Sequence, residues 1–292
     1  MKIHLIDGTY ELFRHHFGAP PRHAPDGREV GATLGVLRSL LMLVSTPGVT
    51  HVACAFDHII ESFRNQLYAG YKTGAGVDPA LLAQFGLVED AVSALGLAVW
   101  PMIEFEADDA LASAVKRFGG RESVEQIVLC SPDKDLAQLV SGKRVVAWDR
   151  RREIVLDEAG VKAKFGVRPT SIPDWLALVG DTADGFPGLP GWGEKSAAAI
   201  LARHPHLEDI PPDVARWRIK ELSAGRAARL AQTLSERRDD AYLFRKLATL
   251  RRDVPIHERL SDLKWRGAHP RLRELCRELG DDKLPDRVRV WR

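Results

Sequence analysis

The stretch from Glu104 to Asp135, EFEADDALASAVKRFGGRESVEQIVLCSPDKD, decides the fold. Gln126–Cys130 (QIVLC) is a short apolar run between polar residues, which is the pattern of a buried strand. Residues 107–115 are expected to form a helix, so three acids crowd its first turn. Two more acids follow the strand, in a turn begun by Ser131-Pro132. Five carboxylates of this stretch lie at the start of the helix or directly after the strand: Glu106, Asp108, Asp109, Asp133 and Asp135.

These five carboxylates lie beside segments that we expect to be buried. A buried carboxylate without a partner is strongly unfavourable, and several of them together repel one another. A hard divalent cation with oxygen ligands removes both penalties, so the stretch predicts a metal site. It also leaves a second interpretation open, because acids at the start of a helix suit the helix dipole.

Length and charge favour a globular protein with an uneven surface. The chain has 292 residues, which allows one large or two small domains. Residues 1–202 hold 20 Lys+Arg and 25 Asp+Glu, a net charge of −5, whereas residues 203–292 hold 22 and 15, a net charge of +7. The basic region suits a polyanion such as nucleic acid, and a solvated basic surface is the alternative.

Cysteine usage and the N-terminus indicate the compartment. The three cysteines, Cys54, Cys130 and Cys276, are odd in number and form no C-x-x-C pair. This argues against a disulfide framework or a zinc site and favours a reducing compartment, which we expect to be the cytoplasm. The N-terminus enters a strand rather than a signal peptide. No apolar run approaches the roughly 20 residues of a membrane span.

Short apolar segments alternate with helical ones along the first half of the chain. This alternation predicts βαβ units and therefore a mostly parallel sheet flanked by helices. Functional sites of such sheets form at the carboxyl ends of the strands, where Asp7, Asp57 and the Asp133/Asp135 pair fall. The expected strands are residues 2–7, 51–57, 97–100, 126–130, 144–148 and 153–156, and expected helices include residues 31–44, 157–165 and 172–179.

Two further segments surround this expected site. Residues 61–96 hold Arg64, Tyr71 and Lys72, then a flexible TGAG loop, and then a helix that Asp78-Pro79 opens and that ends near Gly96. A loop of this kind suits a mobile element over the site, and an ordinary surface connection is the alternative.

A glycine hairpin follows a second pair of acids. Asp181 and Asp184 are followed at once by GLPGWG at residues 188–193 and by a strong helix at residues 194–203. A tight hairpin between two helices exposes backbone N–H groups at the start of the second helix, which is a site for a phosphate. Lys195 adds positive charge there.

Five blocks of the sequence resemble the bacterial 5′-nucleases, namely the 5′→3′ exonuclease domain of DNA polymerase I and its stand-alone flap-endonuclease relatives. The resemblance covers roughly residues 1–255 and implies a PIN-like α/β core with a helix-hairpin-helix module. We expect the PIN-like nuclease core at residues 1–170 and the DNA-binding module with basic C-terminal helices at residues 171–292. The blocks are LIDGTYELFRHHF, AFDHIIESFRNQLYAGYK, EFEADDALA, SPDKDLAQLV and ALVGDTADGFPGLPGWGEKSA.

The resemblance also assigns site residues. It implies that two or more Mg²⁺ or Mn²⁺ ions are held by nine acids, Asp7, Asp57, Glu106, Asp108, Asp109, Asp133, Asp135, Asp181 and Asp184. Arg64 and Lys72 match basic residues that approach the scissile phosphate, and Tyr71 matches an aromatic residue beside them. The hairpin matches the module that grips duplex DNA, with carbonyl groups that can hold K⁺; its expected DNA-binding residues are Gly191, Gly193, Lys195 and Ser196.

Three features depart from the family pattern. Gly185 stands where the family usually has Asn, and no Lys or Arg occurs between Lys72 and Lys116, the part of the family's helical arch that is usually basic. The sequence ends at Arg292, before any polymerase domain. We therefore expect a free-standing nuclease unless it acts with a separate DNA polymerase. We also expect a monomer, with a separate DNA polymerase and ligase as its partners.

The carboxylates and the resemblance together predict the chemistry. Oxygen ligands suit Mg²⁺, and two such ions can activate water and stabilise the transition state of phosphodiester hydrolysis. We expect a structure-specific 5′-nuclease that acts on flapped, branched or nicked DNA in replication and repair. One alternative is a nuclease for RNA or RNA–DNA hybrids. The other is a non-catalytic binder of DNA structures, against which the complete set of acids argues.

Overall fold

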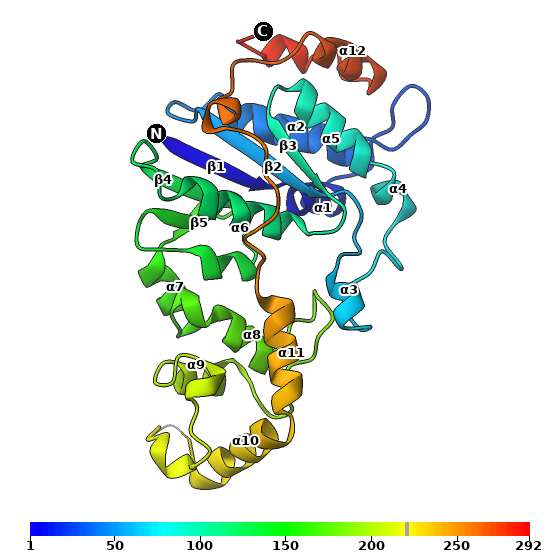
Figure 1. Cartoon of the computed structure of the whole chain (residues 1–292). Coiled ribbons are helices and arrows are strands. Elements are labelled where there is room, and N and C mark those ends of the chain that lie inside the picture. Colours follow the sequence, from blue (N-terminus) through cyan, green and yellow to red (C-terminus); the bar gives the residue numbers. More distant parts are fainter. Residues whose placement is uncertain (220–221) are drawn as a thin grey trace. The chain divides into compact units, whose positions relative to one another are not determined.

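The protein folds into two compact units built from interleaved segments, in a computed structural model that describes residues 1–219 and 222–292 (Figure 1). Unit 1 contains residues 1–62, 74–131 and 251–292, and unit 2 contains residues 63–73 and 132–250. The sequence predicted two contiguous domains that meet between residues 170 and 171. Each observed unit instead combines segments that are separated in the sequence. Each unit is described by itself below.

A four-stranded parallel sheet forms the centre of unit 1. Its strands are β1 (Lys2–Asp7), β2 (His51–Asp57), β3 (Ala98–Met102) and β4 (Gln126–Cys130), in the spatial order β3-β2-β1-β4. The prediction of a mostly parallel sheet is therefore confirmed. Chain order reverses direction between β1 and β4, and in parallel sheets this reversal marks where ligands bind.

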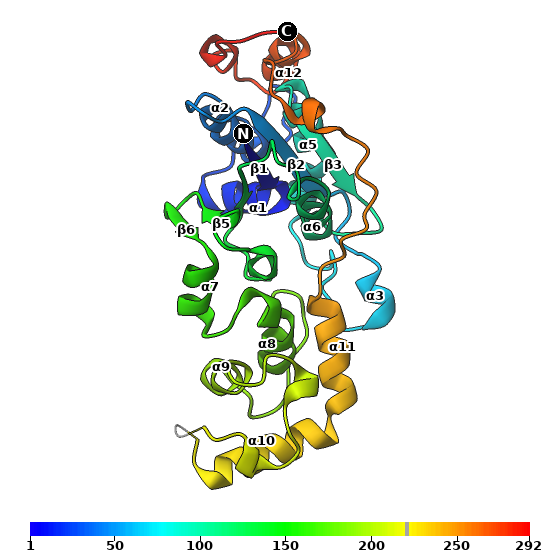
Figure 2. The same ribbon diagram turned by 60° about the vertical axis from the view of Figure 1, so that its left-hand side comes forward.

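Helices cover both faces of this sheet. The connections from β1 to β2 and from β2 to β3 run in one direction across the sheet, and the connection from β3 to β4 runs back. Because such crossovers are right-handed, α6 (Ala107–Phe118) covers the face opposite to α2 (Gly31–Val44) and α5 (Phe85–Ala94), as Figures 1 and 2 show. The other helices of unit 1 are α1 (Gly8–Gly18), α4 (Pro79–Leu82) and α12 (Arg271–Glu278).

The helix predicted from Pro79 to Gly96 is two helices, so this prediction is wrong in detail. The break between α4 and α5 falls at Ala83–Gln84. The Gln84 side chain is fully buried, and its Oε1 accepts hydrogen bonds from the backbone N–H and the hydroxyl of Thr33. This polar contact to α2 lies at the interruption, and no periodicity within residues 79–96 could reveal it.

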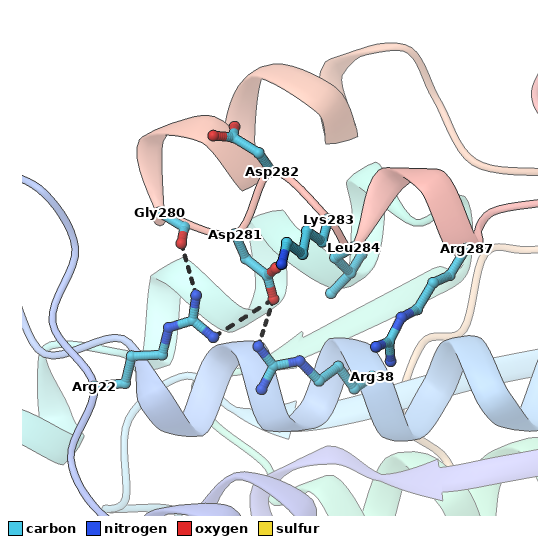
Figure 3. A pocket seen from close by; sticks show the side chains of 8 residues that line it. All are labelled: Arg22, Arg38, Gly280, Asp281, Asp282, Lys283, Leu284 and Arg287. Atoms are coloured by element: carbon cyan, nitrogen blue, oxygen red, sulfur yellow. Dashed lines mark hydrogen bonds and ion pairs between the residues drawn. The ribbon is translucent and has the colours of Figure 1, made fainter.

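Within unit 1, a buried carboxylate binds the C-terminal segment to the N-terminal part of the chain. Asp281 pairs with both Arg22 and Arg38, and Arg22 also donates a 2.6 Å hydrogen bond to the carbonyl of Gly280 (Figure 3). These residues line a pocket of about 450 Å³ together with Asp282, Lys283, Leu284 and Arg287. Because Asp281 forms ion pairs with both arginines, the residues that line this pocket connect the C-terminal segment to α2 and to the loop that carries Arg22.

Unit 2 is mainly helical. It contains the antiparallel pair β5 (Val145–Asp149) and β6 (Ile154–Leu156). Its core includes Trp175, Phe186, Trp192 and Trp217. No helix within the described residues is long and apolar enough to cross a membrane. The helices of unit 2 are α3 (Arg64–Leu67), α7 (Glu158–Phe165), α8 (Ile172–Val179), α9 (Glu194–Leu201), α10 (Ala224–Glu236) and α11 (Arg238–Ala248).

Candidate metal centre

Unit 2 brings three of the predicted acids together. One carboxylate oxygen from each of Asp135, Asp181 and Asp184 lies within 4.8 Å of the others. Asp135 begins the 3₁₀ turn Asp135–Leu139, and Asp181 and Asp184 belong to the tight turn that follows α8. The turn closes because the N–H groups of Gly185 and Phe186 both donate to the carbonyl of Asp181. Backbone geometry, rather than side-chain packing, therefore sets the spacing of Asp181 and Asp184.

The electrostatics of this group fit a cation. Asp135 is 5% exposed, and its Oδ1 atom is buried without a hydrogen-bond partner. Burial raises the pKa of Asp135 well above its ordinary value, and the charges of Asp133, Asp184 and Asp181 raise it further. A buried acceptor of this kind is costly unless a ligand completes it. A divalent cation with oxygen ligands fits this donor set.

Two lysines touch the same acids. The Nζ atom of Lys134 lies 2.8 Å from Oδ1 of Asp181, and the Nζ atom of Lys72 lies 3.1 Å from Oδ1 of Asp184. The backbone N–H of Lys72 also donates a 2.9 Å hydrogen bond to the carbonyl of Asp184. Lys72 was predicted from the sequence, whereas Lys134 was missed. Its position between Asp133 and Asp135 was the available signal, since a cation between two acids can pair with a third.

The other residues predicted beside Lys72 are buried. Arg64 is 1% exposed, and its guanidinium donates to the carbonyls of Leu247 and Thr249 at the end of α11. Tyr71 is 3% exposed and belongs to the core of unit 2. Asp133 is exposed, and its Oδ1 accepts the N–H of Asp135 at 2.8 Å. These contacts give Arg64, Tyr71 and Asp133 structural roles in unit 2, and their catalytic and metal-binding roles stay predictions.

Unit 1 positions the remaining acids at the carboxyl edge of its sheet. Asp7 ends β1; it caps α1 by accepting the N–H of Tyr10 and also accepts a hydrogen bond from the hydroxyl of Ser131, which follows β4. Asp57 ends β2, and its Oδ1 accepts the N–H of Ala107 at 2.7 Å. Strand ends and a helix start therefore meet around these two carboxylates, as the sequence predicted.

The acids at the start of α6 differ in their surroundings. Glu106 is 5% exposed and accepts a 2.6 Å hydrogen bond from the hydroxyl of Ser62. Asp109 is fully buried, and its two oxygens accept the N–H groups of Glu106 and Arg251. Asp108 is partly exposed. Asp109 thus caps its own helix and holds the backbone at Arg251, and Glu106 completes the same capping box.

The predicted glycine hairpin forms, and it exposes a lysine. Gly191 has φ of +81°, a conformation that L side chains rarely adopt. Lys195 is exposed in the first turn of α9. Ser196 is 3% exposed, and its hydroxyl is bonded to the backbone of Gly193 at both N–H and carbonyl. The Ser196 hydroxyl therefore stabilises the hairpin from inside, while Lys195 faces solvent.

Known proteins are similar to this chain in sequence and fold. The sequence model described as "5'-3' exonuclease, N-terminal resolvase-like domain" matches residues 2–166, and "5'-3' exonuclease, C-terminal SAM fold" matches residues 167–271. The 5'-3' exonuclease of Aquifex aeolicus is 31% identical, over 95% of this chain and 90% of that protein. DNA polymerase I of Bacillus caldotenax is 29% identical over 96% of this chain, but the chain spans only 31% of that polymerase.

A solved structure shows the same fold. The flap endonuclease of bacteriophage T5, in a complex with DNA and metal ions, superposes with a TM-score of 0.66 over 98% of this chain and 96% of that chain, at 18% identity. At this identity the likeness establishes the fold alone. The sequence matches go further and identify the class, which is that of nucleases. Within this class, the chain belongs to the 5'-3' exonuclease family.

Proposed function

We propose that this protein is a divalent-metal-dependent 5′-nuclease that hydrolyses phosphodiesters at 5′ flaps, branches or nicks of duplex DNA. One observation carries the proposal: Asp135, Asp181 and Asp184 converge within 4.8 Å, and a buried oxygen of Asp135 has no partner. Family membership indicates the class of reaction, and the group of acids offers ligands for the metal ions that the reaction would use. The complete set of nine acids counts against a binder without catalytic activity.

The acids of each unit would hold metal ions. In unit 2, Asp135, Asp181 and Asp184 would bind Mg²⁺ or Mn²⁺, with Asp133 adding negative charge from the adjoining turn. In unit 1, Asp7, Asp57, Glu106 and Asp108 would bind a further ion, while Asp109 fixes the start of α6. When bound, such cations neutralise the phosphate and make a water molecule more acidic.

The protein's own groups then bind and orient the substrate. The ammonium group of Lys72, released from Asp184, would stabilise the negative charge that develops on the phosphate. Arg64 would hold the segment that carries Lys72 in place through its hydrogen bonds to the end of α11. The hairpin from Gly191 to Lys195 would bind phosphates of the duplex through backbone N–H groups and the lysine. Carbonyl groups of the same hairpin would hold K⁺.

The cellular setting follows as part of the proposal. Flaps and nicks arise during replication and repair, so the protein would act beside a separate DNA polymerase and a ligase. We expect it to work as a monomer in the cytoplasm.

Fragment mapping tests this function. A duplex with a 5′ flap, labelled at its 3′ end, is incubated with the protein and Mg²⁺ or with EDTA, and product lengths are read on a denaturing gel. We expect cleavage near the base of the flap with Mg²⁺ and none with EDTA. A matched substrate whose flap strand is RNA tests the alternative function, a nuclease for RNA or RNA–DNA hybrids. If the hybrid is cleaved faster than the DNA substrate, the hybrid is the preferred substrate. Binding without any cleavage would contradict the proposal.

A further inference from the structure

Lys134 occupies an unusual position in the metal centre of unit 2. It lies between Asp133 and Asp135 in the chain, yet its side chain reaches the acid of a different turn, at 2.8 Å from Oδ1 of Asp181. The ammonium group of Lys134 therefore lies directly against one of the three converging carboxylates.

The contact involves a carboxylate that a cation would need. The ligand oxygens of Asp135, Asp181 and Asp184 lie within 4.8 Å of one another, and Asp181 is only 3% exposed. Its Oδ1 atom accepts both the Lys134 ammonium and the N–H of Ala183. An ammonium ion and a divalent cation cannot both occupy the same side of this carboxylate, since each requires close oxygen contact and both are positive.

We propose that Lys134 is an internal counter-ion that competes with the divalent cation for Asp181, and that it thereby weakens and tunes metal binding in unit 2. Lys72 has the same relationship to Asp184, at 3.1 Å. The inference rests on the proposed metal-dependent function. It adds that Lys134 lowers the affinity for the metal even when no substrate is bound. In the metal-free protein, Lys134 balances the charge of the acids; when a cation binds, the ammonium group leaves Asp181.

The expected consequence is a trade between folding and metal affinity. Removing the ammonium group leaves Asp135, Asp181 and Asp184 with one cation fewer, so the metal-free protein becomes less stable. The same change leaves the site more negative and frees Oδ1 of Asp181, so a divalent cation binds more tightly. A residue that merely packed in this place would shift stability without tightening metal binding.

Metal titration of the DNA-free full chain tests the proposal. Mn²⁺ binding is measured by calorimetry on the wild type and on Lys134→Met, which keeps the length of the side chain without its charge. Asp181→Asn identifies the binding event that belongs to unit 2. We expect this event to tighten at least tenfold in Lys134→Met. The control is Lys162→Met on the exposed surface of α7, which should bind Mn²⁺ as the wild type does. Unchanged or weaker binding by Lys134→Met would overturn the proposal.

A thermal-melting cycle covers the case in which Lys134→Met folds poorly. Melting temperatures are measured in EDTA for Lys134→Met, Asp181→Asn and the double variant. We expect Lys134→Met to melt lower than the wild type, Mn²⁺ to restore it, and the Asp181→Asn background to abolish the difference. An equal loss in both backgrounds would refute the pairing. Neither measurement uses DNA, so a failure of the proposed nuclease function would leave this result intact.

Discussion

The Nε atom of Arg64 donates a 2.7 Å hydrogen bond to the carbonyl of Leu247, which is 183 residues further along the chain. The same guanidinium reaches the carbonyl of Thr249 at 3.3 Å. The last carbonyls of a helix have no partners within the helix, and a cation there also suits the helix dipole. Arg64 therefore ties the short helix α3 to the end of α11.

This contact predicts that Arg64 supports the fold as well as the reaction. Arg64→Ala should lower the free energy of unfolding by about 2–4 kcal/mol, because buried carbonyls lose charged donors and a cavity remains. Urea denaturation checks the value. Arg229→Ala, on the exposed side of α10, is the matched control and should change stability by less than about 0.5 kcal/mol. If both variants are equally stable, Arg64 has no structural role.

Gly185 predicts a second effect on stability. Its φ is +87°, and an added Cβ would lie 2.2 Å from the carbonyl oxygen of Gly70. Gly185→Ala should cost about 1–3 kcal/mol for the backbone alone, and it should push the segment that carries Lys72 away from Asp184. We expect a lower melting temperature and slower turnover. Gly225→Ala, in the first turn of α10 where a Cβ meets nothing within 4 Å, should lower neither. An unaffected Gly185→Ala would disprove the close approach.

This glycine also explains a departure from the family pattern. The sequence shows only that Gly185 replaces the usual Asn. The structure shows that the backbone of residues 70–72 lies directly against it, with the N–H of Lys72 bonded to the carbonyl of Asp184. A side chain at position 185 would occupy the space of the Gly70 carbonyl.

The stability of unit 2 should depend on pH through the ion pair between Glu208 and Arg245. Both guanidinium nitrogens of Arg245 bond to Glu208 at 2.6 Å, which lowers the pKa of Glu208 from 4.5 to about 2. A carboxyl group with a lowered pKa in the folded state stabilises the fold above its ordinary pKa. This contribution is lost as the pH falls from about 4.5 towards about 2. The effect is small because the Glu208 side chain is 52% exposed.

Urea denaturation at several pH values measures this contribution. Glu208→Gln should be less stable than the wild type at pH 6, and the difference should shrink between pH 4.5 and pH 3. Salt should reduce the difference at pH 6, since an exposed pair is screened. A difference between the two proteins that does not change with pH would show that Glu208 acts through packing instead.

Lys195 predicts how the hairpin binds DNA. It is exposed at the start of α9, directly after the turn at Gly191. If it contacts a phosphate, Lys195→Ala should weaken binding to every duplex sequence alike and flatten the slope of log affinity against log salt by about one unit. Fluorescence anisotropy at four salt concentrations checks this. Lys164→Ala on α7 is the exposed control. An unchanged slope, or a loss that depends on base sequence, would rule out a phosphate contact.

Many strands and helices could be predicted from the sequence because neighbouring residues determine where each of them begins and ends. Apolar runs that end in aspartate located β1 and β2 with their observed bounds, and apolar spacing located α2. The bounds expected for α8 are also those observed. The convergence of Asp181 and Asp184 could also be predicted, because both lie in one short turn with fixed backbone bonds. In these cases, neighbouring residues alone determine the structure.

Contacts between distant segments were beyond prediction. The bond from Arg64 to α11, the burial of Tyr71 and the bond from Arg251 to Asp109 each depend on which segments meet in the folded chain. The same holds for Lys134, whose partner Asp181 lies 47 residues further along the sequence (181 − 134). Sequence patterns identify acids and helices, but they do not say which oxygen accepts which donor.

Cleavage by an Asp135→Asn variant tests the central claim most directly. Single-turnover rates on a labelled 5′-flap duplex are measured with saturating protein and Mg²⁺ for the wild type, Asp135→Asn and Asp239→Asn, an exposed acid of α11. The amide keeps the shape of the side chain but cannot supply a charged ligand, and a loss of several kcal/mol corresponds to a rate about 100-fold lower or more. We predict this loss for Asp135→Asn and a wild-type rate for Asp239→Asn. Cleavage by Asp135→Asn at the wild-type rate would contradict the account.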